Sequence, residues 1–223
     1  PERLPRFAEK FGYGDFIHLV PREDGAADMM KGDKYFRTIQ PNCWDAKMRI
    51  DEYATHHTQV QVVCTIPVMF SYWSKAKDGE ELSRFLNDHI IQLCKDYPKN
   101  YVGLGTVPMQ DAEEAIKELH RIKKEGLKGI QIGSNINQKN LSEAEFFPIF
   151  EACEQLDLAV MIHPWEMMGF DSMRKYWLPW LVGMPAETSR AACSLIFGGV
   201  LERLPKLRVN FSHAGGSFLP TLG

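Results

Sequence analysis

Two stretches of this chain have the pattern of a strand that ends on a histidine. In the first, the apolar run Ala159–Ile162 leads directly into His163, and Pro164 follows. A short apolar run without alternation is typical of a strand buried on both faces, as in a parallel sheet. Because proline disfavours helical geometry in the residue before it, His163 should still be extended at the strand's carboxyl end.

The second stretch, Leu207–Ser212, also reaches a histidine, His213, and the glycine pair Gly215-Gly216 then breaks the strand. In a (β/α) barrel, side chains at the carboxyl ends of different strands converge on one site. We therefore predict that His163 and His213 face a shared site.

Strand and helix patterns alternate along the chain from residue 59 to residue 213. The predicted strands are Gln59–Ile66, Tyr101–Val107, Gly129–Ile132, Ala159–His163 and Arg208–His213. The predicted helices run from Asp78 or Glu80 to Asp96, from Asp111 to Glu125, from a Ser142/Glu145 capping box to about Leu156, and from about Glu187 to Arg203. This alternation predicts right-handed βαβ units on a parallel sheet. An open doubly wound sheet is the alternative, but it calls for a glycine-rich phosphate loop after an early strand.

The first 44 residues do not follow this rhythm. They are rich in Gly, Pro and charged residues with short aromatic patches, so we expect an irregular or hairpin insertion at about 11–43 within one domain spanning 1–223. Asp45 can cap a helix that follows it, through about Thr58. Because the chain begins at Pro1 and ends at Gly223, we expect a partial sequence.

Composition narrows the class of partner. The net charge is −3, the pI is about 6.2 and no Lys/Arg-rich run occurs, which argues against nucleic acid and anionic membranes. No apolar stretch approaches the roughly 18 residues of a membrane span. Five scattered cysteines without a CxxC pattern indicate reduced thiols in an intracellular protein.

The two strand-end histidines are the residues best placed for chemistry. Imidazole suits metal ligation or proton transfer near neutral pH, although a core histidine with a satisfied hydrogen bond is the alternative. A catalytic zinc normally has three protein ligands, so the pair alone does not make such a site. Four other histidines are assigned to the surface or to packing, namely His56, His57, His89 and His120. His18 is assigned no role.

The stretch Trp165–Glu187 is unusually long for a connection and rich in large apolar side chains. Loops of this length are functional or disordered, and the aromatic content argues against disorder. Two interpretations of this stretch are equally compatible with the sequence: a lid over the site and an oligomer surface. Arg37 could clamp a carboxylate, or it could be an ordinary solvated arginine.

Several strings are specific enough to show a resemblance. They include Pro67–Trp73 (PVMFSYW), Tyr176–Glu187 (YWLPWLVGMPAE), His163-Pro164-Trp165 and His213–Gly216 (HAGG). Across essentially all of residues 1–223, the chain resembles the aminocarboxymuconate-semialdehyde decarboxylases, in the metal-dependent decarboxylase branch of the amidohydrolase superfamily.

The resemblance implies a zinc-dependent, non-oxidative decarboxylation on a (β/α)8 TIM-type barrel. The implied small-molecule substrate is 2-amino-3-carboxymuconate 6-semialdehyde, in the kynurenine branch of tryptophan breakdown, where its removal limits quinolinate and NAD formation. By position, His163 matches the metal ligand on the fifth strand and His213 the sixth-strand histidine that activates the metal-bound water. Arg37 and Trp180 match substrate-binding residues. A cytosolic homodimer is also implied.

Part of the pattern implied by the resemblance is absent from residues 1–223. The family also holds its metal with an HxH pair on the first strand and an aspartate on the eighth, and neither occurs here. We therefore expect about five of eight barrel strands, without the first, seventh and eighth, and a polypeptide that is inactive alone and unable to hold zinc. Two alternatives remain open: a metal-dependent hydrolase of the same superfamily, and a non-catalytic truncated form that associates with a full-length partner.

Overall fold

A five-stranded parallel sheet forms the centre of the computed structural model, which describes residues 4–218 and 220. Its strands are β4 (Gln61–Val63), β5 (Tyr101–Gly105), β6 (Gly129–Gly133), β9 (Ala159–His163) and β10 (Val209–Phe211). They lie side by side in chain order, and every neighbouring pair is parallel. A doubly wound sheet reverses its strand order at a switch point. The sequential order therefore excludes that alternative in the described residues and makes the sheet an arc of a barrel.

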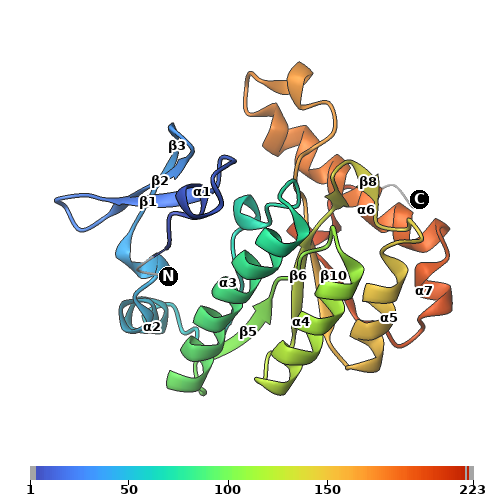
Figure 1. Ribbon diagram of the computed structural model, residues 1–223, viewed down its shortest axis with the longest axis horizontal. Helices are drawn as coiled ribbons and strands as arrows, with labels where there is room; N and C mark the ends of the chain where they lie inside the picture. Colours follow the sequence, from blue (N-terminus) through green and yellow to red (C-terminus); the bar gives the residue numbers. More distant parts are fainter. Residues whose placement is uncertain (1–3, 219, 221–223) are drawn as a thin grey trace.

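Helices connect these strands and lie across the sheet. They are α3 (Ala76–Asp96), α4 (Ala112–Lys124), α5 (Phe147–Gln155), α6 (Met184–Phe197) and α7 (Val200–Arg203). In Figure 1, α3, α4 and α5 stand next to one another along the sheet, and each contacts the next. Crossovers of one hand between strands in sequential order place the helices on a single face of the sheet, and the site of such a barrel lies at the carboxyl ends of its strands.

Local sequence accounts for the start of α4. Asp111 caps the helix as predicted, because its Oδ1 accepts the Glu114 N–H at 3.1 Å. Gly126 follows the helix with a φ of +97°, a conformation that favours glycine.

The predicted start of α5 is wrong. Ser142 and Glu145 do not form a capping box: the Ser142 N–H donates to Ser194 Oγ at 2.9 Å, and Glu145 pairs with Lys139. The helix begins instead at Phe147, where Pro148 in the first turn supplies a φ suited to a helix start.

The single helix predicted over Glu187–Arg203 is also wrong. Residues 184–186 already belong to α6, and the glycine pair Gly198-Gly199 separates α6 from α7. Gly199 has a φ of +72°, which interrupts the helix there.

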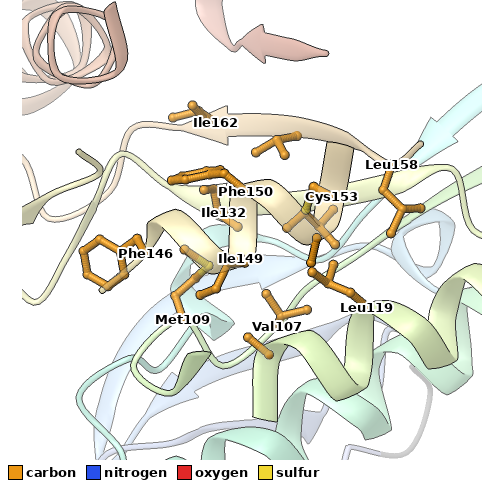
Figure 2. Packing of buried hydrophobic residues seen from close by; sticks show 14 of the residues in the cluster. Val107, Met109, Leu119, Ile132, Phe146, Ile149, Phe150, Cys153, Leu158 and Ile162 are labelled. Atoms are coloured by element: carbon orange, nitrogen blue, oxygen red, sulfur yellow. The ribbon is translucent and has the colours of Figure 1, made fainter. Parts of the chain in front are cut away.

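The main core lies between the sheet and its helices. Ile130 and Ile132 of β6 and Val160 and Ile162 of β9 are fully buried. Figure 2 shows Ile132 and Ile162 next to side chains of α5, namely Ile149, Phe150 and Cys153. Each fully buried aliphatic side chain contributes about 1.5–3 kcal/mol. This packing fixes β6 and β9, which carry one half of the site described below.

An antiparallel sheet occupies residues 17–39. After α1 (Phe7–Phe11), the strands β1 (Ile17–Pro21), β2 (Ala27–Lys31) and β3 (Lys34–Ile39) pair in chain order. In Figure 1 these blue strands lie to one side of the parallel sheet. A second apolar cluster, which includes Phe7, Phe16, Met29 and Leu82, joins this part to α3.

The helix α2 (Ala46–Ala54) links the antiparallel sheet to β4. Asp45 caps it as predicted, since its Oδ1 accepts the Met48 N–H at 2.8 Å. The helix ends earlier than Thr58, and His56 and His57 lie in the turn after it. Among the described residues, no helix combines the length and the apolar character that crossing a membrane requires.

Candidate functional site

His163 and His213 meet at the carboxyl edge of the parallel sheet. Their Nε2 atoms are 3.2 Å apart, and the ring centroids are 5.0 Å apart at an interplanar angle of 77°. Strands β9 and β10 are neighbours in which Ile162 pairs with Phe211; His163 directly follows Ile162, and His213 comes after Phe211 and Ser212. The predicted meeting of the two rings is confirmed.

The tautomer of His163 follows from its second ring nitrogen. Nδ1 lies 2.9 Å from the carbonyl oxygen of Pro164, which can only accept a hydrogen bond. We therefore assign the proton to Nδ1, and the lone pair of Nε2 faces His213. Burial lowers the pKa of His163, the charge of a protonated His213 lowers it further, and the Pro164 contact opposes both. His163 is thus a neutral imidazole at pH 7, which is the form that binds metals.

His213 occupies a strained turn rather than the strand predicted over Arg208–His213. The strand β10 ends at Phe211, and His213 and Ala214 have φ values of 55° and 56°. A left-handed conformation in residues other than glycine is costly and is found preferentially at functional sites. The end of this turn packs directly on α6. Gly216 lies so near the Pro185 carbonyl oxygen that a Cβ on this glycine would be only 2.4 Å from it. Since His163 Nε2 carries a lone pair, His213 Nε2–H is the donor between the rings.

A buried polar atom lies on the same face of the sheet. Gln131 pairs with Met161 and Gly133 with His163, so in alternating strands Gln131 shares the face of His163. Gln131 is 2% exposed, and its Oε1 has no hydrogen-bond partner within residues 4–218. A buried acceptor without a partner is costly, so this face is suited to a polar ligand or water.

Arg37 lies on β3, away from the histidine pair. It is exposed, and its guanidinium sits 5.2 Å from the centroid of the Phe36 ring. It also lines a hollow of about 220 Å³ whose lining includes Arg49 and His89 but neither histidine of the pair. The structure does not bring Arg37 to the pair, and its substrate role stays a prediction.

Trp180 belongs to the stretch predicted as a long connection. That stretch contains a 3-10 turn (Phe170–Met173) and a π-helical turn (Pro179–Gly183) before α6 begins. Trp180 is 47% exposed, and its ring centroid lies 4.9 Å from that of Trp177. The shallow hollow that it lines includes neither His163 nor His213, so its substrate role also stays a prediction.

Three polar residues that the sequence reasoning did not single out surround the turn after His163. Ser134 and Asn135 follow β6, and Glu187 lies in the first turn of α6. All three are buried, and Ser134 and Asn135 both donate a hydrogen bond to Glu187. Their only sequence signal is that Ser134 and Asn135 follow a strand end; their link to Glu187 spans more than 50 residues.

The donor set of the site fits one metal ligand. His163 offers Nε2 while Nδ1–H is held by a backbone carbonyl, the usual arrangement of a metal-binding histidine. No group of three or more His, Cys, Asp or Glu side chains suited to a metal occurs in the part of the chain that the structure describes. Within the described residues, His163 therefore offers one nitrogen donor of the kind that binds metals, without a complete set of ligands.

The fold and the site define a barrel-type α/β protein with chemistry at the carboxyl edge of its strands. The family model described as Amidohydrolase matches residues 17–222, and the chain belongs to this family. The predicted barrel fold is thereby confirmed.

Relatives that match the whole of this chain are decarboxylases. The chain is 54% identical over its whole length to the 2-amino-3-carboxymuconate-6-semialdehyde decarboxylase of Dictyostelium discoideum, and it spans 62% of that protein. It is 45% identical to the protein of that name from Sus scrofa, covering all of this chain and 78% of the relative. The predicted resemblance is confirmed.

A solved decarboxylase shares the fold. The 5-carboxyvanillate decarboxylase of Novosphingobium aromaticivorans, solved with bound manganese, superposes with a TM-score of 0.71 at 28% identity. The match covers 78% of this chain and 51% of that one. This relative carries a divalent metal.

Proposed function

We propose that the complete protein is a metal-dependent decarboxylase that removes CO2 from 2-amino-3-carboxymuconate 6-semialdehyde. One observation carries the proposal: two imidazoles from neighbouring strands face each other, with a lone pair on His163 Nε2. Identity of 54% to a decarboxylase named for this substrate supports the choice of substrate. The proposed metal is zinc, although the metal in the solved 5-carboxyvanillate decarboxylase is manganese.

The roles of the two histidines follow from their protonation. His163 would hold the metal through Nε2. When bound, a divalent metal supplies a Lewis acid that lowers the pKa of a coordinated water. With His163 Nε2 engaged by the metal, the exposed His213 ring would carry its own proton on Nδ1, and its Nε2 would then take up a proton in the same volume and return it. Loss of CO2 leaves an electron pair on carbon, and a proton returned by His213 completes the product.

The cellular setting is part of the proposal. We place the reaction in the kynurenine branch of tryptophan breakdown in the cytosol, where it limits quinolinate and NAD formation. We also propose a homodimer. The segment 165–183, orange and projecting in Figure 1, supports it with exposed apolar side chains: Tyr176 is 80%, Trp177 69% and Leu181 68% exposed. Large apolar patches of this kind mark interaction surfaces. Arg37 and Trp180 remain proposed substrate contacts.

Substitution of each histidine in the complete protein tests the roles. His213→Ala should lower kcat by about 100-fold or more, the usual contribution of a proton-transfer group, while the metal content is retained. His163→Ala should lose both metal and activity. His120→Ala, at an exposed position on α4, is the matched control. CO2 release and metal content by mass spectrometry are the measurements. Loss of metal from His213→Ala would make His213 a ligand instead of a proton carrier.

Residues 1–223 expressed alone should have no decarboxylase activity. The described residues offer no set of three metal ligands, and catalytic zinc normally uses three. Equilibrium dialysis with zinc and a CO2-release assay check this expectation. Tight binding of one zinc per chain together with turnover would contradict the assignment of His163 as an isolated part of the metal site.

A further inference from the structure

Glu187 is an acidic side chain in the interior of the fold. It is 0% exposed although it lies only in the first turn of α6. Its carboxylate accepts four hydrogen bonds. Oε1 accepts from Ser134 Oγ at 3.2 Å, from Asn135 Nδ2 at 3.0 Å and from Arg190 Nη1 at 3.3 Å. Oε2 accepts the Met168 N–H at 3.1 Å. All four partners are donors, which is the complement of a carboxylate.

One side of this network holds the turn that leaves His163. The Ser134 N–H donates to the His163 carbonyl at 3.0 Å, and the Trp165 N–H donates to Ser134 Oγ at 3.1 Å. Asn135 Nδ2 donates to the Trp165 carbonyl at 2.9 Å as well as to Glu187. Ser134 Oγ lies 3.3 Å from that carbonyl and 3.2 Å from Glu187 Oε1, and we assign its proton to the carboxylate because a charged acceptor forms the stronger bond. The carboxylate is the final acceptor for both residues that clamp Trp165.

The other side holds the start of the segment 165–183. The bond from Met168 N–H to Glu187 Oε2 joins residues 19 apart in the chain. The segment beyond Met168 carries the exposed rings of Tyr176 and Trp177. A loop with few buried contacts opens locally at small cost, so a single buried anchor has a large effect on it.

We propose that Glu187 is a positioning residue that fixes the His163 turn with one carboxylate oxygen and the segment 165–183 with the other. Its hydrogen-bond partners are Ser134, Asn135, Met168 and Arg190 and not the histidine pair, and its effect on turnover rests on the proposed function. Its effects on metal affinity and on the segment's mobility do not require turnover.

Two variants separate the two halves of the carboxylate's role. In Glu187→Gln the amide oxygen at the Oε1 position keeps three bonds, whereas the amide NH2 then faces the Met168 N–H, donor against donor. This variant should release the segment and leave the His163 turn held. Ser134→Ala removes the acceptor of the Trp165 N–H but leaves the Met168 anchor in place. It should loosen His163 and leave the segment held.

The test uses the complete protein with Glu151→Gln, an exposed position on α5, as the control. For Glu187→Gln we expect amide exchange in peptides from 167–183 to speed up about tenfold. We also expect KM to rise about fivefold, with kcat and the zinc dissociation constant within twofold. For Ser134→Ala we expect zinc to bind about tenfold more weakly, with segment exchange unchanged.

Three outcomes would overturn the proposal. They are weaker zinc binding by Glu187→Gln with unchanged segment exchange, no change in either variant, and equal effects of both variants on both readouts. If Glu187→Gln does not fold, unchanged zinc affinity in Ser134→Ala would by itself refute the His163 half. An intact protein without decarboxylase activity would refute the proposed function, while the exchange and zinc measurements would still decide the role of Glu187.

Discussion

Replacing Tyr72 by phenylalanine removes one hydrogen bond from the strand end beside His163. Tyr72 is 3% exposed, and its hydroxyl accepts the Gly133 N–H at 3.0 Å. Gly133 is the register partner of His163. The Tyr72 ring stacks on Phe70 with centroids 5.4 Å apart and an interplanar angle of 12°, and phenylalanine keeps that contact. Tyr72→Phe therefore isolates a single buried N–H that loses its acceptor.

The expected loss follows from that orphaned donor. A buried donor left without a partner costs about 1–3 kcal/mol, so the free energy of unfolding should fall by about 2 kcal/mol. With a urea m-value on the order of 2–3 kcal/mol per molar, the midpoint should fall by roughly 0.7–1 M with an unchanged slope. Amide exchange at Gly133 should accelerate in the same variant, because its N–H no longer has a partner.

The control for this measurement is Tyr53→Phe. Tyr53 is 41% exposed, and its hydroxyl has no hydrogen bond within the described part of the chain. Its removal should change the free energy of unfolding by less than about 0.5 kcal/mol, as is usual for surface substitutions. Equal midpoints for Tyr72→Phe and Tyr53→Phe would refute the reasoning and mean that another acceptor takes over the Gly133 N–H.

Three further predictions concern stability and thiol reactivity. Burial lowers the pKa of His89 to about 4, against about 6.5 in an unfolded chain, so the unfolded state binds the extra proton between these values. The free energy of unfolding should therefore fall as the pH drops from 6.5 to 4. His89→Leu should remove about 1–2 kcal/mol of that loss, after allowance for solvent screening. The measurement is the urea midpoint of both proteins at pH 4.5 and at pH 7. Gly129→Ala should lower the free energy of unfolding by about 3 kcal/mol or more, because a Cβ at this position would lie 2.2 Å from the Ala159 carbonyl oxygen. Thermal and urea unfolding measure this loss, and an unchanged midpoint would contradict the register of β6 and β9. Burial raises the pKa of the Cys153 thiol to about 12, so a thiol reagent should label exposed Cys43 at once and Cys153 only after unfolding; early labelling of Cys153 would show that the core opens.

The elements whose signals are local could be predicted from the sequence. The strand Ala159–His163 is observed with its predicted bounds, because an unbroken apolar run and the following proline define both ends. Asp111 and Asp45 cap their helices because a capping side chain acts on a backbone N–H only three residues away. The convergence of His163 and His213 also followed, since parallel strands in chain order share one carboxyl edge.

The predictions that were wrong or missing concern features set by competition between local signals or by contacts between residues distant in the sequence. Ser142 and Glu145 match a capping box, but Pro148 sets the helix start, and Ser194 and Lys139 bind the two side chains instead. Such partners are distant in sequence, so no window of residues reveals them. Glu187 was missed for the same reason: its donors Ser134 and Asn135 lie more than 50 residues away.

The distribution of hydrogen bonds explains why the two histidines can have different roles although they lie side by side. His163 belongs to a strand, its Nδ1 is fixed by Pro164, and its backbone is clamped by Ser134. His213 lies beyond its strand in a left-handed turn, and its ring is exposed. A ligand must keep one nitrogen aimed at a fixed point, whereas a proton carrier must exchange protons with its surroundings. The rigid histidine, His163, therefore suits the metal, and the exposed one, His213, suits proton transfer. If this assignment were wrong, the metal would be lost from His213→Ala and retained by His163→Ala.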